Sequence, residues 1–105
     1  MKKTKSVVCR QTEYCAICGQ PATQEHHLIF GTNRHLAEAH GLKIPICANC
    51  HTAGLIPARI HDNPMAEKLS KMLGQAIFER EMAFRGADRD ECKAIFRQEF
   101  GKTYF

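Results

Sequence analysis

Two cysteine pairs are the residues whose types and spacing most clearly indicate chemistry. Each has the form Cys-x2-Cys, Cys15 with Cys18 and Cys47 with Cys50, and 28 residues separate the pairs. Two tight turns that each present two thiolates supply a closed tetrahedron for Zn²⁺. Such a site keeps no coordination position for a substrate, so this zinc is expected to be structural and to hold the two turns together. Two disulfides, or incidental buried cysteines, are the alternatives.

Four histidines follow the cysteine pairs closely enough to meet. His26 and His27 come after the first pair, His51 directly follows the second, and His61 precedes a helix start. Adjacent side chains of an extended segment point to opposite faces, so one of His26 and His27 can bind a metal while its neighbour faces a substrate. Three neutral imidazoles on a divalent cation leave positions for water and a phosphate oxygen, and an unligated histidine can accept a proton from that water.

Each histidine also has a simpler explanation, and the residues alone leave it open. His51 could replace a cysteine in the zinc site or cap a carbonyl group. His61, which is followed by Asp62, could be a solvated residue at a helix start. The pair His26 and His27 could lie on a half-exposed strand without any ligand.

The segments that must position these side chains are short in the N-terminal part of the chain. We expect strands at 25–30 and 43–46, with Pro45 at an edge or bulge of the second. About two helical turns are expected between them, over 33–40, and Gly41 should end them.

Two helices are expected in the C-terminal part. The first begins at Asn63-Pro64, an N-cap followed by proline, and its apolar face is expected to comprise Leu69, Met72, Leu73, Ala76 and Ile77. The second begins at the capping sequence Asp88-x-x-Glu91 and ends at Gly101; it should bury Cys92, Ile95, Phe96 and Phe100.

Length and charge limit the domain organisation. The chain has 105 residues, 15 Lys+Arg and 11 Asp+Glu, which gives a formal charge of +4. We expect one domain over 14–105, with the zinc and metal sites in 14–63 and the C-terminal helices in 64–105. Residues 1–13 are expected to form a loose basic arm with a short strand at 6–10.

The location and the partner class also follow from the composition. No apolar run reaches the ~20 residues of a membrane span, and no secretory apolar segment follows the basic start. We therefore expect a cytoplasmic protein with no membrane partner, whose reduced thiols favour metal over disulfides. The excess of basic residues is compatible with nucleic acid as a partner.

Taken in order, the motifs CAICG, EHHLIFG, NRHLAEAHGL, ICANCH and IHDN resemble the small HNH endonucleases common in phages and prophages. The resemblance runs from Tyr14 to nearly the end of the chain. It implies a small α+β fold in which a four-cysteine zinc supports a ββα-metal (HNH) core, and a metal-dependent cut in DNA.

The resemblance also assigns roles to individual residues. His27 matches the general base, while His26, His51 and His61 match ligands of a catalytic cation, Mg²⁺ or another divalent ion. The middle asparagine of the motif is missing before the second cysteine pair. Asn33 is the expected replacement as the brace of the loop between the strands, and Asn63 is a weaker candidate.

DNA is the expected partner of such an enzyme. Arg34, Lys43 and Arg59 are the basic residues closest in sequence to the histidines and are the expected phosphate contacts. A double-strand cut would favour a homodimer. The alternative to an enzyme is a catalytically inactive, zinc-stapled module that binds nucleic acid or a partner, for example an accessory protein of phage packaging or recombination.

Overall fold

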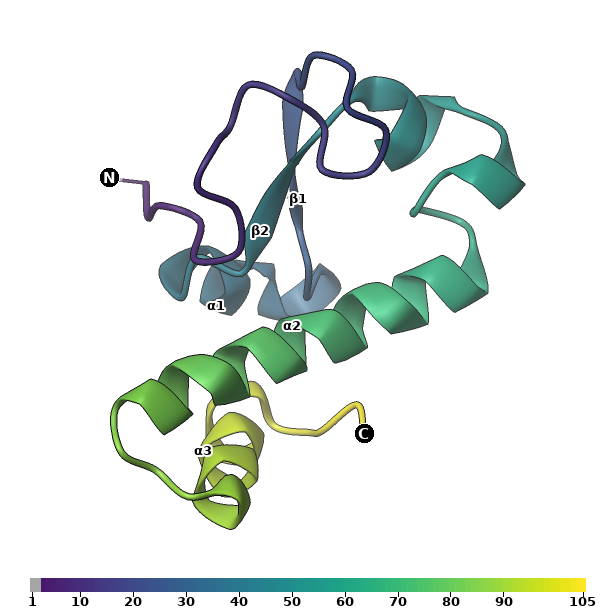
Figure 1. Ribbon diagram of the computed structural model, residues 1–105. Helices are drawn as coiled ribbons and strands as arrows, with labels where there is room; N and C mark the ends of the chain where they lie inside the picture. Colours follow the sequence, from purple (N-terminus) through teal and green to yellow (C-terminus); the bar gives the residue numbers. More distant parts are fainter. Residues whose placement is uncertain (1–2) are drawn as a thin grey trace.

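Two short strands pair beside two longer helices in an α+β arrangement (Figure 1). The computed structural model describes residues 3–105. In chain order its elements are β1 (Gln24–His27), η1 (Gly31–Asn33), α1 (Arg34–Ala39), β2 (Lys43–Ile46), η2 (Asn49–Ala53), η3 (Ile56–Ala58), α2 (Pro64–Phe84) and α3 (Arg89–Phe100). None of the helices in the described part of the chain has both the length and the apolar character that crossing a membrane requires.

The strands form a two-stranded antiparallel sheet in which Gln24 lies opposite Ile46 and His27 opposite Lys43. The second strand has the expected bounds, but the first ends at His27, three residues early. Leu28 N–H still donates to the Leu42 carbonyl at 2.8 Å, but pairing stops there because Gly41, at φ 69°, turns the partner chain just before β2. Pro45 faces the outer edge of the pair, where its carbonyl accepts the Ala16 N–H at 2.9 Å, so its missing N–H removes no ladder bond.

The N-terminal arm is fastened to the domain, so the expectation of a loose arm is wrong. Thr4 N–H donates to Glu38 Oε2 at 3.1 Å, and Val7 N–H donates to the Gly41 carbonyl at 2.9 Å. A Cβ at position 41 would collide with the Lys5 carbonyl oxygen, so this glycine is needed for the close approach. The expected strand at 6–10 is absent from the structure, since the arm crosses the sheet instead of pairing along it.

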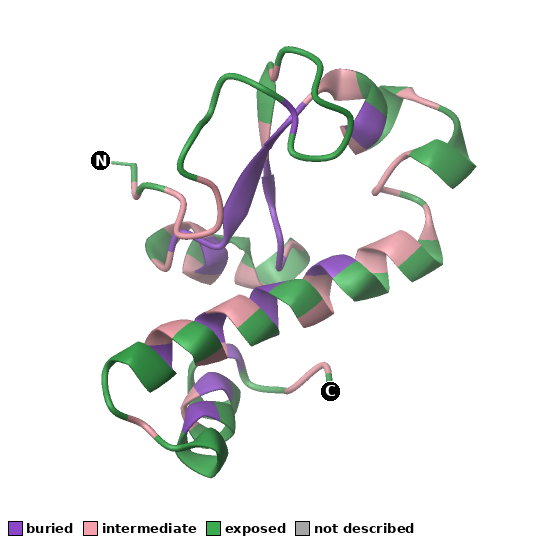
Figure 2. Cartoon of the chain, viewed as in Figure 1, coloured by how far each residue is buried: buried purple, intermediate pink, exposed green. Residues whose placement is uncertain are grey.

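Helix α2 begins at the expected Asn63-Pro64 but turns a different face to the core. Leu69 and Leu73 are 57% and 44% exposed, whereas the buried face comprises Ser70, Gly74, Gln75, Phe78 and Met82 (Figure 2). A Cβ at Gly74 would lie 2.7 Å from Ile29 Cγ1, so the helix packs against the end of β1 through its small residues. The apolar periodicity therefore identified the helix correctly and its packed face wrongly.

Helix α3 completes the core with three of its four expected side chains, Cys92, Phe96 and Phe100, whereas Ile95 is only partly buried. Asp88 and Glu91 form a reciprocal capping box, and Gly101 ends the helix in the left-handed conformation. Its buried side chains join those of α1, α2 and the segments next to the strands in one cluster, made of Ile29, Ala37, Leu42, Phe78, Met82, Cys92, Phe96 and Phe100. This core thus packs against the segments that follow β1 and precede β2, through Ile29 and Leu42.

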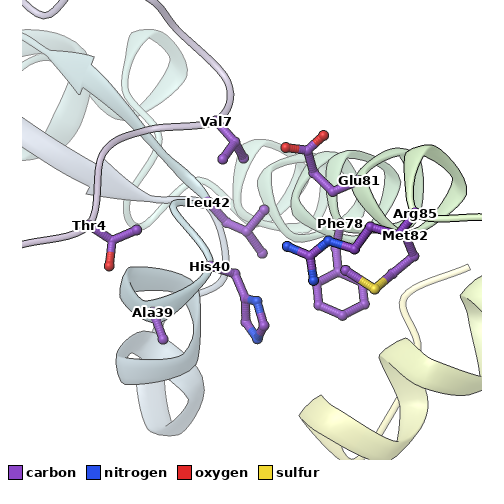
Figure 3. A pocket seen from close by; sticks show the side chains of 9 residues that line it. All are labelled: Thr4, Val7, Ala39, His40, Leu42, Phe78, Glu81, Met82 and Arg85. Atoms are coloured by element: carbon purple, nitrogen blue, oxygen red, sulfur yellow. The ribbon is translucent and has the colours of Figure 1, made fainter.

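A small cavity of about 170 Å³ marks the seam where the arm, α1 and α2 meet (Figure 3). Val7, Leu42 and Phe78 give it an apolar lining. His40, at its edge, donates its Nε2–H to Glu99 Oε1 at 2.7 Å and packs against the Phe78 ring. This histidine ties α1 to α3, away from the other histidines.

Two candidate metal centres

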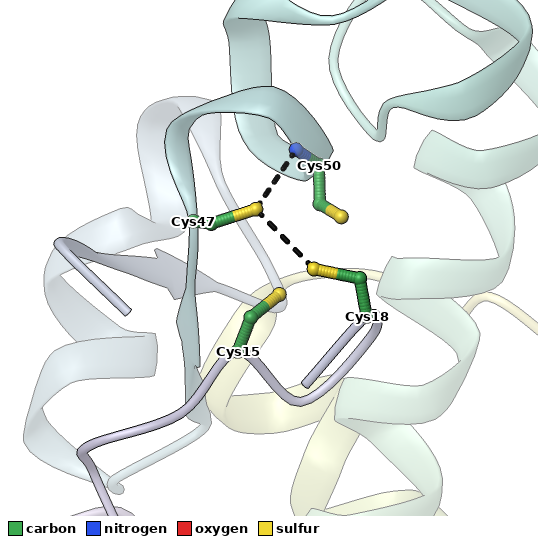
Figure 4. Close-up of side chains that lie close together, drawn as sticks. All are labelled: Cys15, Cys18, Cys47 and Cys50. Carbon is green, nitrogen blue, oxygen red and sulfur yellow. Dashed lines mark hydrogen bonds between the residues drawn. The ribbon is translucent and has the colours of Figure 1, made fainter. Parts of the chain in front are cut away.

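The four paired cysteines meet at the upper end of the sheet (Figure 4). Their Sγ atoms all lie within 4.8 Å of one another, and Cys18 Sγ is 3.6 Å from Cys47 Sγ. A tetrahedral zinc with Zn–S bonds of about 2.3 Å requires sulfur atoms roughly 3.8 Å apart. The cluster therefore fits the expected zinc site. No pair among these cysteines is bonded as a disulfide.

Backbone amides surround this cluster in the way that thiolates require. The Ile17 amide donates to Cys15 Sγ and the Cys50 amide to Cys47 Sγ, each at 3.4 Å. Burial alone would raise the pKa of Cys15, but backbone amides outweigh it and lower that pKa to about 6. Burial and the neighbouring sulfur atoms raise the pKa of Cys50. Four thiolates this close repel one another, and a dication at the centre removes that repulsion.

Three of the four candidate histidines form a second cluster. His26 comes from β1, His51 from η2 and His61 from the turn before α2, and their ring nitrogens lie within 4.8 Å of one another. His51 Nε2 and His61 Nε2 are 3.0 Å apart. His26 is 1% exposed, and its Nδ1 is the buried side-chain nitrogen or oxygen that finds no hydrogen-bond partner among the described residues.

The Nε2 atom of His26 is hydrogen-bonded to a residue of α2. Ser70 Oγ lies 2.8 Å from His26 Nε2 and donates its own proton to the Leu28 carbonyl at 2.8 Å. Because that proton is used, the hydroxyl oxygen must accept from the Nε2–H of His26. The Nδ1 of His26 therefore carries the lone pair, and it is this unpartnered nitrogen that a cation can bind.

The other two imidazoles are oriented in the same way. Gln24 Oε1 lies 2.7 Å from His51 Nδ1, and Glu67 Oε2 lies 3.6 Å from His61 Nδ1. An acceptor beside each Nδ1 places the proton there and leaves the lone pair on Nε2, so the two Nε2 lone pairs face each other. Fixing the outer nitrogen with an acceptor is how proteins orient histidine ligands of metals.

The protonation state also suits a metal centre. Burial, followed by the proximity of His51 and His61, lowers the pKa of His26 to about 3. Burial and His61 lower the pKa of His51 as well. Both rings are therefore neutral near pH 7, which is the form that coordinates a cation.

His27 points to the opposite face of β1 and contacts a different partner. Its Nε2 is 2.8 Å from Glu38 Oε1, and Glu38 also accepts from Lys43 Nζ at 2.9 Å. Burial raises the pKa of Glu38, but the bonds from His27 and Lys43 outweigh it and lower that pKa to about 2. The ionised carboxylate accepts the Nε2–H of His27, which leaves the lone pair on Nδ1. His26 and His27 nevertheless both line one cavity of about 250 Å³, together with His51 and His61.

The three expected phosphate contacts differ in their surroundings. Arg34 is exposed and lines the histidine cavity. Lys43 is 2% exposed and bridges Glu25 and Glu38, so its assignment as a phosphate contact is wrong. Arg59 donates to the carbonyls of His61 and Gly54 and to Asp62. Its guanidinium is therefore occupied by hydrogen bonds within the loop that carries His61.

Neither Asn33 nor Asn63 links the connection between the strands to the histidine site. Asn33 Nδ2 donates to the Phe100 carbonyl at 3.0 Å and so ties η1 to the end of α3. Asn63 caps α2 and donates to the Ile56 carbonyl at 3.1 Å. Glu38 instead links the connection to His27. Sequence reasoning missed Glu38, Ser70 and Gln24, because none lies at a fixed spacing from the histidine it orients.

Replacement of Ser70 by alanine should weaken cation binding at the histidine cluster by 10–100-fold, the usual effect of losing an outer partner of a ligand. The free Nε2 of His26 would then allow the ring to change tautomer. Titration calorimetry with Ni²⁺ on zinc-loaded protein measures the change. Ser6→Ala is the matched control, since this hydroxyl donates to the Lys43 carbonyl outside the cluster. Equal Ni²⁺ affinity for Ser70→Ala and wild type would show that the serine does not orient the ligand.

Comparison with models of protein families, with curated proteins and with solved structures finds no match to this chain. The geometry of the two centres and the order of the motifs are therefore what bears on function. Both centres belong to the segment 15–61, and helix α2, which follows, supplies Ser70 and Glu67 to the histidine cluster.

Proposed function

We propose that this protein is a metal-dependent DNA endonuclease of the HNH type, which hydrolyses phosphodiester bonds. The supporting observation is that two neighbouring histidines of β1 have different surroundings. His26 shares a cluster of inward-facing imidazole lone pairs with His51 and His61, while His27 is held by a carboxylate, and all four rings line one cavity. In this proposal the strands β1 and β2 and the short helical segment η2 would correspond to the ββα element.

The donor set indicates which cations fit the histidine cluster. Three imidazole nitrogens suit zinc, nickel, copper and iron, whereas Mg²⁺ prefers oxygen ligands. A divalent transition metal is therefore the better candidate, ahead of the Mg²⁺ expected first. When bound, such a cation would stabilise the negative charge that develops on the phosphoryl and leaving oxygens.

His27 would act as the general base. Its Nδ1 takes a proton from water as the water oxygen forms a bond to phosphorus and the bond from phosphorus to the 3′ oxygen breaks. The leaving oxygen then takes a proton from solvent. The Glu38 carboxylate keeps the Nε2 proton in place and stabilises the imidazolium that forms. Arg34, on the same cavity, is placed to bind a phosphate oxygen.

Supercoiled plasmid tests this proposal directly. We expect the zinc-loaded protein to nick it with Ni²⁺, Mn²⁺ or Co²⁺, weakly with Mg²⁺, and not with a chelator that strips the histidine cluster. His51→Ala should lose this activity while keeping its structural zinc. His35→Ala, which removes an exposed histidine of α1, should cleave like wild type. Equal cleavage by His51→Ala and wild type would exclude the histidine cluster as the reactive centre.

A second candidate is a binding module without catalysis, and one surface feature favours it. Helix α2 exposes Met65, Leu69 and Leu73 on its outer side, at 75%, 57% and 44%. An apolar stripe of this kind is typical of partner-binding helices. The module predicts one tightly bound zinc and nucleic-acid or protein binding, with no nicking in any metal of the series.

A further inference from the structure

Three hollows of the surface near the histidine cluster share lining residues, and we treat them together as one groove. Glu25 lines all three of them, and Lys3 and Thr12 line both of the two that lie beyond the histidine cavity. One of these two hollows is lined mainly by the N-terminal arm, which contributes Lys5 and Arg10. The groove therefore runs from the histidines, past β1, to the arm.

The groove carries an excess of positive charge. Glu25 is its acidic group, and its two oxygens pair with Lys3 and Lys43, each at 3.0 Å. Lys5 and Arg10 are exposed and form no ion pair with the described residues. Arg34 adds a further exposed cation at the histidine end. The distribution of these cations over three hollows that share lining residues suits an extended polyanion better than a small anion.

The remaining lining indicates which part of a nucleic acid it would contact. Thr12, Thr23 and Gln24 offer hydroxyl and amide donors, which commonly bind phosphate and sugar oxygens. The aromatic side chain of the groove is Phe30, at the histidine end. The Phe30 ring lies 4.7 Å from the ring of His61. The hollows on the arm side thus suit the backbone and not stacked bases.

We propose that this groove binds the phosphodiester backbone of the DNA strand that enters the histidine site, with Lys5 and Arg10 as phosphate contacts. The assignment of DNA rests on the proposed function. A second basic hollow lies on α3 and is lined by Lys93 and Arg97, but it shares no residue with the histidine cavity or the groove. This hollow provides the matched control.

Binding can be measured without cleavage. Fluorescence anisotropy of a labelled DNA duplex, with zinc-loaded protein and no other added metal, gives the affinity at a series of salt concentrations. Each phosphate contact contributes about 0.9 to the slope of log affinity against log salt. The double variant Lys5→Ala/Arg10→Ala should therefore reduce the slope by about two. Lys93→Ala/Arg97→Ala should leave it unchanged, and Lys5→Arg/Arg10→Lys should restore the wild-type slope.

The proposed groove and the proposed nuclease activity can fail independently of each other. An unchanged slope in Lys5→Ala/Arg10→Ala, or a loss confined to the α3 variant, would overturn the groove. Wild-type protein that shows the groove effect but cuts no DNA in any metal would overturn the nuclease and leave the groove in place. Protein that cuts DNA but binds it independently of Lys5 and Arg10 would overturn the groove and leave the nuclease in place.

Discussion

Replacing Cys50 with serine is expected to abolish cooperative folding. Structural zinc sites contribute on the order of 10–16 kcal/mol to folding, whereas a domain has a net stability of about 5–15 kcal/mol. Loss of the tetrahedron should therefore leave no stable fold. The sheet of two short strands is too small to replace it. Circular dichroism during heating should show no sharp transition, and native mass spectrometry should show no tightly held zinc.

Cys9→Ser is the matched control for this experiment. Cys9 is a half-buried cysteine outside the cluster, so its replacement removes a thiol without touching the zinc site. It should keep both the zinc and the melting transition. A Cys50→Ser protein that melts at the wild-type temperature would contradict a structural zinc at this position.

The zinc site also supports the histidine cluster through the backbone. His51 directly follows Cys50, and its amide donates to the Cys47 carbonyl at 3.1 Å. The Ile60 amide then donates to the Cys50 carbonyl at 2.8 Å, and the His61 amide to the His51 carbonyl at 3.1 Å. These bonds place the two rings beside each other because the second cysteine turn is fixed. A zinc ion held by the cysteines would thus help to position histidines that do not touch it.

Features with a local signal could be predicted from the sequence. The two Cys-x2-Cys turns predicted the cysteine cluster, and the capping residues predicted where α2 and α3 begin. The alternation of side chains along β1 predicted that His26 and His27 separate to opposite faces. In each case the relevant physics acts between neighbouring residues.

Features set by long-range packing could not be predicted in this way. Lys43 appears in the sequence as a free surface charge, yet two carboxylates from β1 and α1 bury it. Leu69 belongs to the apolar stripe of α2, but Gly74 allows a closer approach on another face. The pairing of Glu38 with His27 likewise depends on how α1 folds back onto the sheet.

Replacing His27 with alanine is expected to reduce DNA cleavage by 10²–10⁴-fold, the usual contribution of a general base. The zinc content, Ni²⁺ affinity and DNA affinity should persist, because His27 contacts Glu38 and not the other three rings. Single-turnover cleavage of plasmid with saturating Ni²⁺ measures the loss. If the variant cuts at the wild-type rate, the base must be another group.

Glu38→Gln distinguishes positioning from catalysis, because the amide oxygen can still accept the Nε2–H of His27 but carries no charge to stabilise an imidazolium. We expect cleavage to fall less than in His27→Ala, while ¹⁵N NMR still shows an unprotonated Nδ1 on His27. Glu38→Ala removes the acceptor, so the same spectrum should show a mixture of tautomers. Wild-type cleavage and an unchanged spectrum in Glu38→Ala would show that the carboxylate does not hold the ring. A spectrum that changes without loss of cleavage would instead remove His27 from the reaction, since a base in the wrong tautomer presents no lone pair to water.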